Sequence, residues 1–296
     1  MEDEGPDDLV RAERRGRTIL LTLNHPPVNI LSREVLGALG RRLAEAEADR
    51  EVRAIVLASA ATKAFAAGAD IREMAPMGPS AAQEHGSRGQ GITRQIERLP
   101  LPVIAAVHGV CFGGGCEIAL ACDFILASED ASFGQPEINL GVMPGWGGTV
   151  RLPRRIGTTN ARRWILTGRP VPAVQAAAEG LVDRVVPRAE LLPAALELAR
   201  ELSRKPAVAL AAAKFALHRS MDAEVDADLA YELALWARLF DTTGQKEGMR
   251  AFLEKRPLEE AGRGNWTEVS VGFPWAESAA GRPHGKRNKA GASGRS

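Results

Sequence analysis

Apolar residues in the first part of the chain follow two different spacings. Residues 17–24 (RTILLTLN) and 52–59 (VRAIVLAS) are short aliphatic and β-branched runs, which are typical of buried strands. Between them, residues 32–49 carry apolar side chains at helical spacing after Ser32, a residue type that commonly caps helices. This strand–helix–strand order predicts an α/β fold with a parallel or mixed sheet flanked by helices.

The pattern continues with a proline-bounded strand at 100–110, a glycine run, an apolar helix and a strand at 124–128. Residues 72–91 mix Met, Pro, Gly and Ser without a clear period, so they predict either a helix or a loop. From Ala194 to about Glu254 the spacing is helical almost throughout, which predicts an α-helical C-terminal region.

Composition divides the 296 residues into four parts. We expect a disordered N-terminus at 1–8, a core domain at 9–192, a helical subdomain at 193–257 and a disordered tail at 258–296. The tail has five Lys/Arg residues and no acid after Glu277. A nucleic-acid-binding tail is possible on this composition, but a solvated tail is the better interpretation.

Charge and cysteine usage exclude several functional classes. The net charge of +1 gives no reason to expect nucleic acid or a membrane as a partner. The three cysteines lack the CxxC spacing of a zinc site and favour small buried side chains in a reducing compartment. Because of the cysteine spacing, we expect no metal. The N-terminus resembles no targeting signal and no apolar run has transmembrane length, so we expect a cytoplasmic protein.

The glycine run FGGGCEIALACD (112–123) matches neither a phosphate-binding P-loop nor a dinucleotide-binding fingerprint. It lies between a strand and a helix, where glycine lets a ligand approach the backbone and the helix start directs N–H groups at it. Such donors suit an oxygen that develops negative charge. Close packing alone explains the glycines equally well, and nearby His108 is more readily a structural residue than a catalytic one.

Two further segments resemble the glycine run in kind. KAFAAGADI (63–71) is also small and flexible after a strand, and could supply a second N–H donor. FGQPEINLGVMPGWGGTVRLPRRIG (133–157) contains Glu137 among apolar neighbours. Taken alone, Glu137 is either a solvated loop acid or a catalytic acid, and Glu117 is either a catalytic group or a helix-start residue.

Together these segments, with NHPPVNILS, GLVDRVVP and KEGMRAFLEKRP, resemble the crotonase family of enoyl-CoA hydratases and isomerases over about residues 9–257. The resemblance implies a crotonase fold of repeated ββα units with two roughly perpendicular sheets. It also implies a helical C-terminal region that mediates trimer formation, with trimers commonly paired into hexamers.

The resemblance further implies the roles of individual residues. The backbone N–H groups of Ala69 and Gly114 would bind the thioester oxygen of an acyl-CoA. Ala67, Asp70 and Ile71 would line the path of the CoA moiety. Phe252 and Lys255 match a closing motif that can reach the CoA of a neighbouring subunit.

Hydratases of this family carry two glutamates, and here both positions are filled, by Glu117 and Glu137. The resemblance therefore implies a hydro-lyase that reversibly hydrates trans-2-enoyl-CoA in fatty-acid β-oxidation or related metabolism. No cofactor is expected, since CoA enters with the substrate. The alternatives are another crotonase-type enzyme, such as a Δ3,Δ2-enoyl-CoA isomerase, and a non-catalytic acyl-CoA- or RNA-binding relative.

Overall fold

The computed structural model describes residues 8–204 and 243–256, together with residues 210, 211, 213, 214, 217, 233, 236, 237, 240 and 241. Disorder is predicted for residues 1–8 and 258–296, and all of these residues except Asp8 lie outside the described residues, as does much of the predicted helical subdomain.

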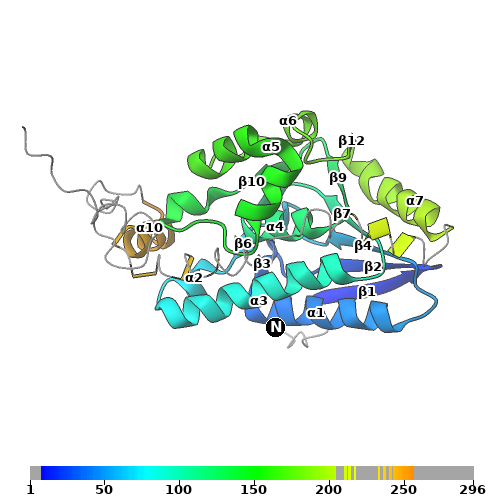
Figure 1. The fold of residues 1–296 in the computed structure, drawn as a ribbon, viewed down its shortest axis with the longest axis horizontal. Helices are drawn as coiled ribbons and strands as arrows, with labels where there is room; N and C mark the ends of the chain where they lie inside the picture. The colour runs from blue at the N-terminus through cyan, green and yellow to red at the C-terminus, as the bar shows by residue number, and fades with distance from the viewer. Residues whose placement is uncertain are drawn as a thin grey trace, which may run out of the picture.

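The described strands form three sheets (Figure 1). The six-stranded sheet has the order β1 (Val10–Arg15), β2 (Thr18–Leu23), β4 (Ala54–Ser59), β7 (Val103–Val107), β9 (Phe124–Ser128) and β12 (Arg184–Val186). The four-stranded sheet has the order β11 (Val171–Pro172), β10 (Ser132–Gly134), β8 (Val110–Phe112) and β5 (Ala64–Ala66). The third pairs β3 (Ile30–Leu31) with β6 (Gly68–Ala69).

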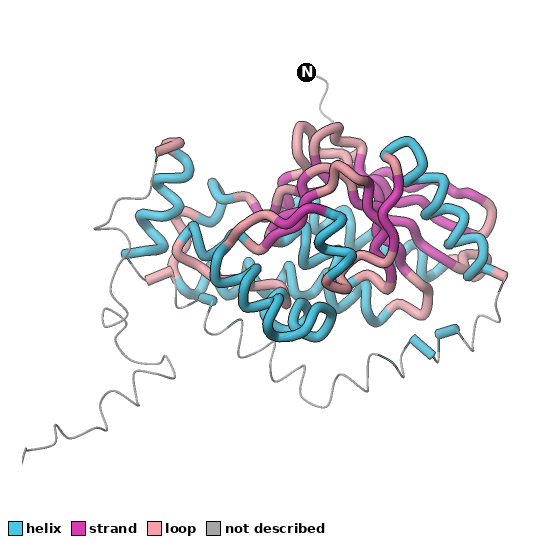
Figure 2. Tube along the Cα trace, turned by 90° about the horizontal axis from the view of Figure 1, so that it is seen from above, coloured by secondary structure: helices cyan, strands magenta, loops and turns pink. Residues whose placement is uncertain are grey.

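Helices cover the sheets on both sides (Figure 2). They are α1 (Arg33–Ala48), α2 (Ile71–Met74), α3 (Pro79–Arg98), α4 (Gly114–Ala121), α5 (Gly148–Thr167), α6 (Ala173–Ala178), α7 (Leu191–Ser203) and α10 (Thr243–Leu253). Two short 3-10 turns, η1 (Pro136–Leu140) and η2 (Arg188–Glu190), connect them. Gly157, with φ of 74°, bends α5.

The predicted strand–helix–strand unit is present as β2, α1 and β4. The two strands pair in parallel from Thr18–Ala54 to Leu23–Ser59, and the Ser32 hydroxyl caps α1 by accepting from the Val35 N–H at 3.3 Å. Alternate side chains of the sheet face opposite layers. Leu21 and Ile55 belong to the core that includes α1, whereas Leu20 and Val56 pack with α7 on the other face.

The single strand predicted at 100–110 is two strands in two different sheets. β7 ends at Val107 in the six-stranded sheet, and β8 begins at Val110 in the four-stranded sheet. Gly109 makes the turn between them with φ of 56°, and a Cβ there would stand 2.2 Å from the Lys63 carbonyl oxygen. Only glycine fits both the backbone conformation and the space.

The segment without a clear period contains a regular helix, α3, which lies beside α1 (Figure 1). Its glycines lower helix propensity, and they obscure the pattern in the sequence. Tertiary packing explains them: a Cβ at Gly89 would stand 2.1 Å from the Trp146 ring, and one at Gly86 would stand 3.2 Å from the Trp236 ring. The glycines therefore admit two indoles against the helix.

The helix α10 packs against α2 and η1, at the end of the molecule opposite α7 (Figure 1). The Lys246 ammonium donates to the Met77 carbonyl at 3.0 Å, and Gly248 lies against Leu140 of η1. Among the helices that the structure describes, none combines the length and apolar character needed to cross a membrane.

Candidate active site

The glycine run forms a sharp junction between β8 and α4. Gly113 caps the helix with φ of 51° and ψ of −124°, a conformation that favours glycine. Gly114 is the first residue of α4, so its N–H belongs to the group that has no acceptor within the helix. All eight residues of α4 are buried, which keeps this helix start inside the protein.

The second expected donor, Ala69, lies in β6 beside this junction. Gly68 precedes it with φ of 106°, and a Cβ at Gly68 would stand 3.8 Å from the Gly114 nitrogen. Ala67 donates its N–H to the Val28 carbonyl at 3.0 Å, and Asp70 caps α2 by accepting from the Arg72 N–H at 2.8 Å. The segment from Ala67 to Ile71 therefore borders the start of α4.

Glu117 projects from the first turn of α4 and is 2 % exposed. Its Oε1 atom accepts two backbone hydrogen bonds, from the Trp146 N–H at 2.7 Å and the Gly148 N–H at 2.8 Å. Gly148 is the first residue of α5, so the carboxylate lies at the positive end of that helix. These donors stabilise its negative charge within a buried site.

Glu137 lies on η1, is half-buried and faces the same junction. Its Oε1 atom is 2.9 Å from the point where a Cβ on Gly113 would stand. The fully buried Gln135 turns its amide nitrogen toward the carboxylate, with distances of 3.1 Å to Oε1 and 3.2 Å to Oε2. This glutamate is therefore oriented by a side chain, whereas backbone groups orient Glu117.

The four residues expected at the reaction centre thus lie at or beside the junction of β8 and α4. Ala69 follows Gly68, which lies against Gly114; Glu137 faces Gly113, and Glu117 follows one turn later. Phe252 and Lys255 lie elsewhere, exposed at the end of α10, and the Lys255 N–H donates to the Phe252 carbonyl at 3.1 Å.

Sequence reasoning missed the groups that orient the two glutamates. The Trp146 and Gly148 N–H groups come from the segment 133–157, in which the sequence singles out only Glu137. Gln135 is two residues before Glu137, and its polarity next to buried Phe133 is the one local signal for a role inside the protein.

The remaining titratable candidates are structural. The His108 Nε2 atom lies 2.7 Å from the Ala61 carbonyl oxygen, and burial lowers the pKa of this imidazole. All three cysteines are unpaired and buried, as expected. Burial, and next the charge of Asp123, raise the pKa of Cys122 to about 12, so its thiol is a poor nucleophile at neutral pH.

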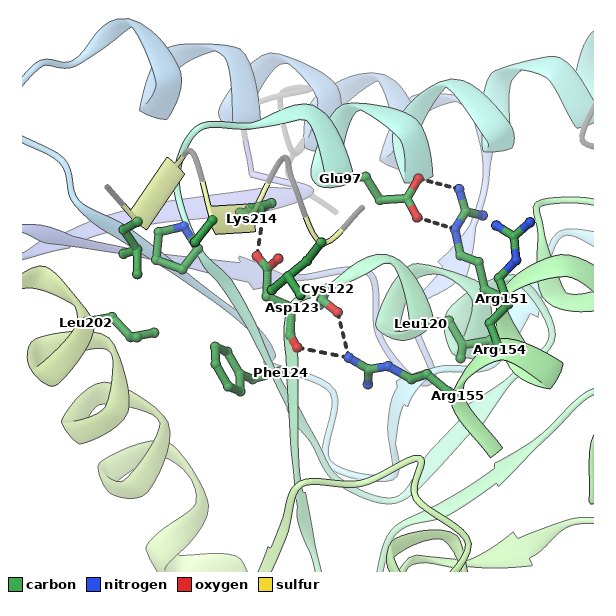
Figure 3. A pocket seen from close by; sticks show the side chains of 14 residues that line it. Glu97, Leu120, Cys122, Asp123, Phe124, Arg151, Arg154, Arg155, Leu202 and Lys214 are labelled. Carbon is green, nitrogen blue, oxygen red and sulfur yellow. Dashed lines mark hydrogen bonds and ion pairs between the residues drawn. The ribbon is translucent and has the colours of Figure 1, made fainter. Parts of the chain in front are cut away.

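A cavity of about 420 Å³ lies at the C-terminal end of α4 (Figure 3), and neither Glu117 nor Glu137 lines it. Its lining includes Leu120, Phe124 and Leu202 together with the side chains of Arg154 and Arg155. In the part of the chain that the structure describes, no cluster of three or more His, Cys, Asp or Glu residues could bind a metal ion.

Comparison with known proteins identifies the family of this chain. The family model for enoyl-CoA hydratase/isomerase matches residues 13–262. A short-chain-enoyl-CoA hydratase of Clostridium acetobutylicum is 41% identical over 248 residues, which cover 83% of this chain and 95% of the relative. A crotonyl-CoA hydratase of Syntrophomonas wolfei is 38% identical over 82% of this chain and 94% of its own.

Solved structures show the same fold. A crystal structure of an enoyl-CoA hydratase from Bacillus anthracis matches with a TM-score of 0.69 and 35% identity, covering 86% of this chain and 99% of that one. A carnitinyl-CoA hydratase from Mycobacterium avium matches with a TM-score of 0.75 and 32% identity, over 86% and 99% of the chains. The chain has the crotonase fold and belongs to the enoyl-CoA hydratase/isomerase family.

Proposed function

We propose that the protein is an enoyl-CoA hydratase that adds water reversibly across the C2–C3 double bond of a trans-2-enoyl-CoA. The observation that carries this proposal is the pair of inward-facing carboxylates beside one helix start. Relatives named as hydratases of short-chain enoyl-CoA and crotonyl-CoA support it. Addition of water requires a base for the water and an acid for carbon, and two carboxyl groups can supply both.

In the proposed mechanism, Glu117 is the base. Its carboxylate takes a proton from water while the water oxygen bonds to C3. The two N–H groups on Oε1 favour a charged carboxylate at this position. They also limit rotation of the side chain, which favours a fixed approach of the water to C3.

Glu137 is the proposed acid. When the C3–O bond forms, the electrons of the C2–C3 double bond move onto the thioester oxygen, and Glu137 then donates a proton to C2. The excess proton on Glu117 returns to Glu137 through solvent, which restores the starting state. Two neighbouring carboxyl groups that share one proton are suited to this exchange, because both are costly to ionise together.

The backbone N–H groups of Ala69 and Gly114 are the proposed donors to the thioester oxygen. The position of Gly114 at the start of α4 supports this role, because the helix directs partial positive charge at the oxygen. Ala67, Asp70 and Ile71 are the proposed contacts for the CoA moiety. The reaction needs no cofactor beyond the CoA that the substrate carries.

We also propose that the active protein is a homotrimer or a pair of trimers. The exposure of Phe252 and Lys255 at the end of α10 supports their proposed contact with CoA bound to a neighbouring subunit. A cytoplasmic location stays a prediction from the unpaired cysteines.

The test is hydration of crotonyl-CoA, followed as loss of the absorbance of the conjugated enoyl thioester and confirmed by mass analysis of the 3-hydroxybutyryl-CoA formed. Rapid turnover supports the proposal. If the protein instead converts a 3-enoyl-CoA to the conjugated isomer without hydrating crotonyl-CoA, it is an isomerase. Binding of the thioester without either reaction contradicts both assignments.

A further inference from the structure

One face of α3 carries polar side chains that are directed into the protein. Gln90, Thr93 and Glu97 are spaced by three and four residues, so they lie on the same side of the helix. Gln90 is 4 % exposed and Thr93 is fully buried. Burial of such side chains is costly unless their polar atoms have partners.

Outside α3, these three side chains contact the segment from Gly145 to Arg151. The Gln90 amide donates to the Gly145 carbonyl at 3.1 Å, and the Thr93 hydroxyl lies 3.1 Å both from the Trp146 carbonyl oxygen and from the Gln90 carbonyl oxygen of its own helix. Glu97 accepts two hydrogen bonds from Arg151, at 2.6 Å from Nε and 2.7 Å from Nη2 (Figure 3). This face of α3 is therefore hydrogen-bonded to one segment of the chain at three positions.

Arg151 extends the arrangement to the same carbonyl group that Thr93 contacts. Its Nη1 atom donates to the Trp146 carbonyl at 2.8 Å, while its other nitrogens are paired with Glu97. The guanidinium thus joins a carboxylate on α3 to a main-chain oxygen. Its planar, forked donors suit this double contact, and lysine cannot reproduce it.

The opposite edge of this segment contacts Glu117. The peptide group between Gly145 and Trp146 accepts from Gln90 through its oxygen and donates to Glu117 through its nitrogen. Thr93 and Arg151 both contact the Trp146 carbonyl oxygen. The Gly148 N–H, two residues after that of Trp146, also donates to Glu117. The carbonyl groups of this segment are therefore held by α3 and Arg151, and its N–H groups orient the Glu117 carboxylate.

We propose that Arg151, oriented by Glu97, is a positioning residue for Glu117: it fixes the Trp146 carbonyl so that the Trp146 and Gly148 N–H groups point at Oε1. This inference rests on the proposed role of Glu117 as the base. A buried ion pair contributes little net stability over well-packed apolar residues, so the pair is better explained by the main-chain contact that it makes.

The test compares Arg151→Lys and Glu97→Gln with a matched control, Arg155→Lys. Arg155 lies one turn later on α5 and also donates to main-chain carbonyls, those of Asp123 at 2.9 Å and Cys122 at 3.1 Å, at the far end of α4 (Figure 3). The first readout is kcat and KM for crotonyl-CoA hydration. The second is exchange of the C2 hydrogens of butyryl-CoA in D2O, which in the proposed mechanism depends on Glu137.

We expect both test variants to lower kcat for hydration about tenfold or more, with little change in KM or in C2 exchange. Arg155→Lys should leave kcat within about twofold. If Arg151→Lys does not fold, Thr93→Val takes its place as the test variant. It removes one hydrogen bond at nearly constant side-chain volume and should lower kcat about threefold.

Equal hydration rates in Arg151→Lys and Arg155→Lys would overturn the inference. A parallel loss of hydration and C2 exchange in the Arg151 and Glu97 variants would also overturn it, since that indicates general damage to the fold. If the wild-type protein does not hydrate crotonyl-CoA, the proposed function itself fails. The two failures are therefore distinguishable.

Discussion

The carboxylates of Glu117 and Glu137 differ in burial and in the kind of group that contacts them. Around Glu117, main-chain N–H groups from the start of α5 bind one carboxylate oxygen of a nearly fully buried residue. Around Glu137, a half-buried carboxylate on a short 3-10 turn is approached by the Gln135 amide. A backbone cradle favours a charged, immobile base, whereas a side-chain partner allows a carboxyl group to gain and lose a proton.

The largest expected effect is that of Glu117→Gln. The amide cannot take a proton from water, although its carbonyl oxygen can still accept from the Trp146 and Gly148 N–H groups. We expect kcat for crotonyl-CoA hydration to fall by about 1,000-fold or more. Steady-state kinetics measure this, with Glu129→Gln, an exposed acid, as the control. A loss below about tenfold would contradict the role of base.

Glu137→Gln should have a smaller but still large effect, because solvent can deliver a proton to C2 from an exposed direction. We expect a fall of about 100-fold in kcat with an unchanged circular dichroism spectrum. A larger loss of kcat than in Glu117→Gln would show that proton donation, rather than removal of a proton from water, limits the reaction. The predicted order of the two effects would then be wrong.

Gln135 joins the two regions. Its amide contacts Glu137, and a Cβ on Gly148 would stand 3.1 Å from its Cδ atom. Gln135→Leu removes the donors at similar size, and we expect kcat to fall about tenfold. Gln175→Leu is the control, since the Gln175 amide also donates to a glutamate, Glu179, but on α6. Equal activity of both variants would show that Glu137 needs no side-chain partner.

The smallest effect on activity is expected at His85, which packs on the Trp146 ring. His85 is 1 % exposed, and its ring centroid lies 5.8 Å from that of Trp146 and 5.9 Å from that of Trp236. Burial, and next the positive charge of Arg88, lower the pKa of His85 to about 4. The neutral imidazole therefore adds no charge to the Glu117 region at neutral pH.

This pKa has a consequence for stability. The unfolded chain binds the proton first as the pH falls, so stability is lost between about pH 6.5 and about pH 4, by on the order of 3 kcal/mol. His85→Phe should unfold at nearly the wild-type urea concentration at pH 7 and lose much less stability at pH 4.5. An equal loss in both proteins would assign the acid sensitivity to other groups.

The residues alone single out Glu117, Glu137 and the glycine-rich segments, whereas the roles of the two glutamates and of the donors at Ala69 and Gly114 come from the family resemblance and stay predictions. The sequence could not predict Trp146 and Gly148 as partners of Glu117. These contacts join residues about thirty positions apart, and they depend on how α5 approaches α4. The helix α3 was uncertain for the same reason, since its glycines are explained only by the indoles that pack on them.

The fold shows a similar division. The strand–helix–strand unit of β2, α1 and β4 is specified by local periodicity and by the cap at Ser32. The division of residues 100–110 between two sheets is not, because the reason is the space beside Gly109, where the Lys63 carbonyl approaches. The helical subdomain predicted at 193–257 is described only in part, as α7 and α10 with ten single residues between them.

The most direct test of the division between the glutamates is exchange of the C2 hydrogens of butyryl-CoA in D2O, measured by mass spectrometry for the wild type, Glu117→Gln and Glu137→Gln. Butyryl-CoA has no double bond to hydrate, so exchange reports only the group that moves a proton at C2. The account predicts exchange in the wild type and in Glu117→Gln, and its loss in Glu137→Gln. Exchange that survives in Glu137→Gln and disappears in Glu117→Gln would contradict it.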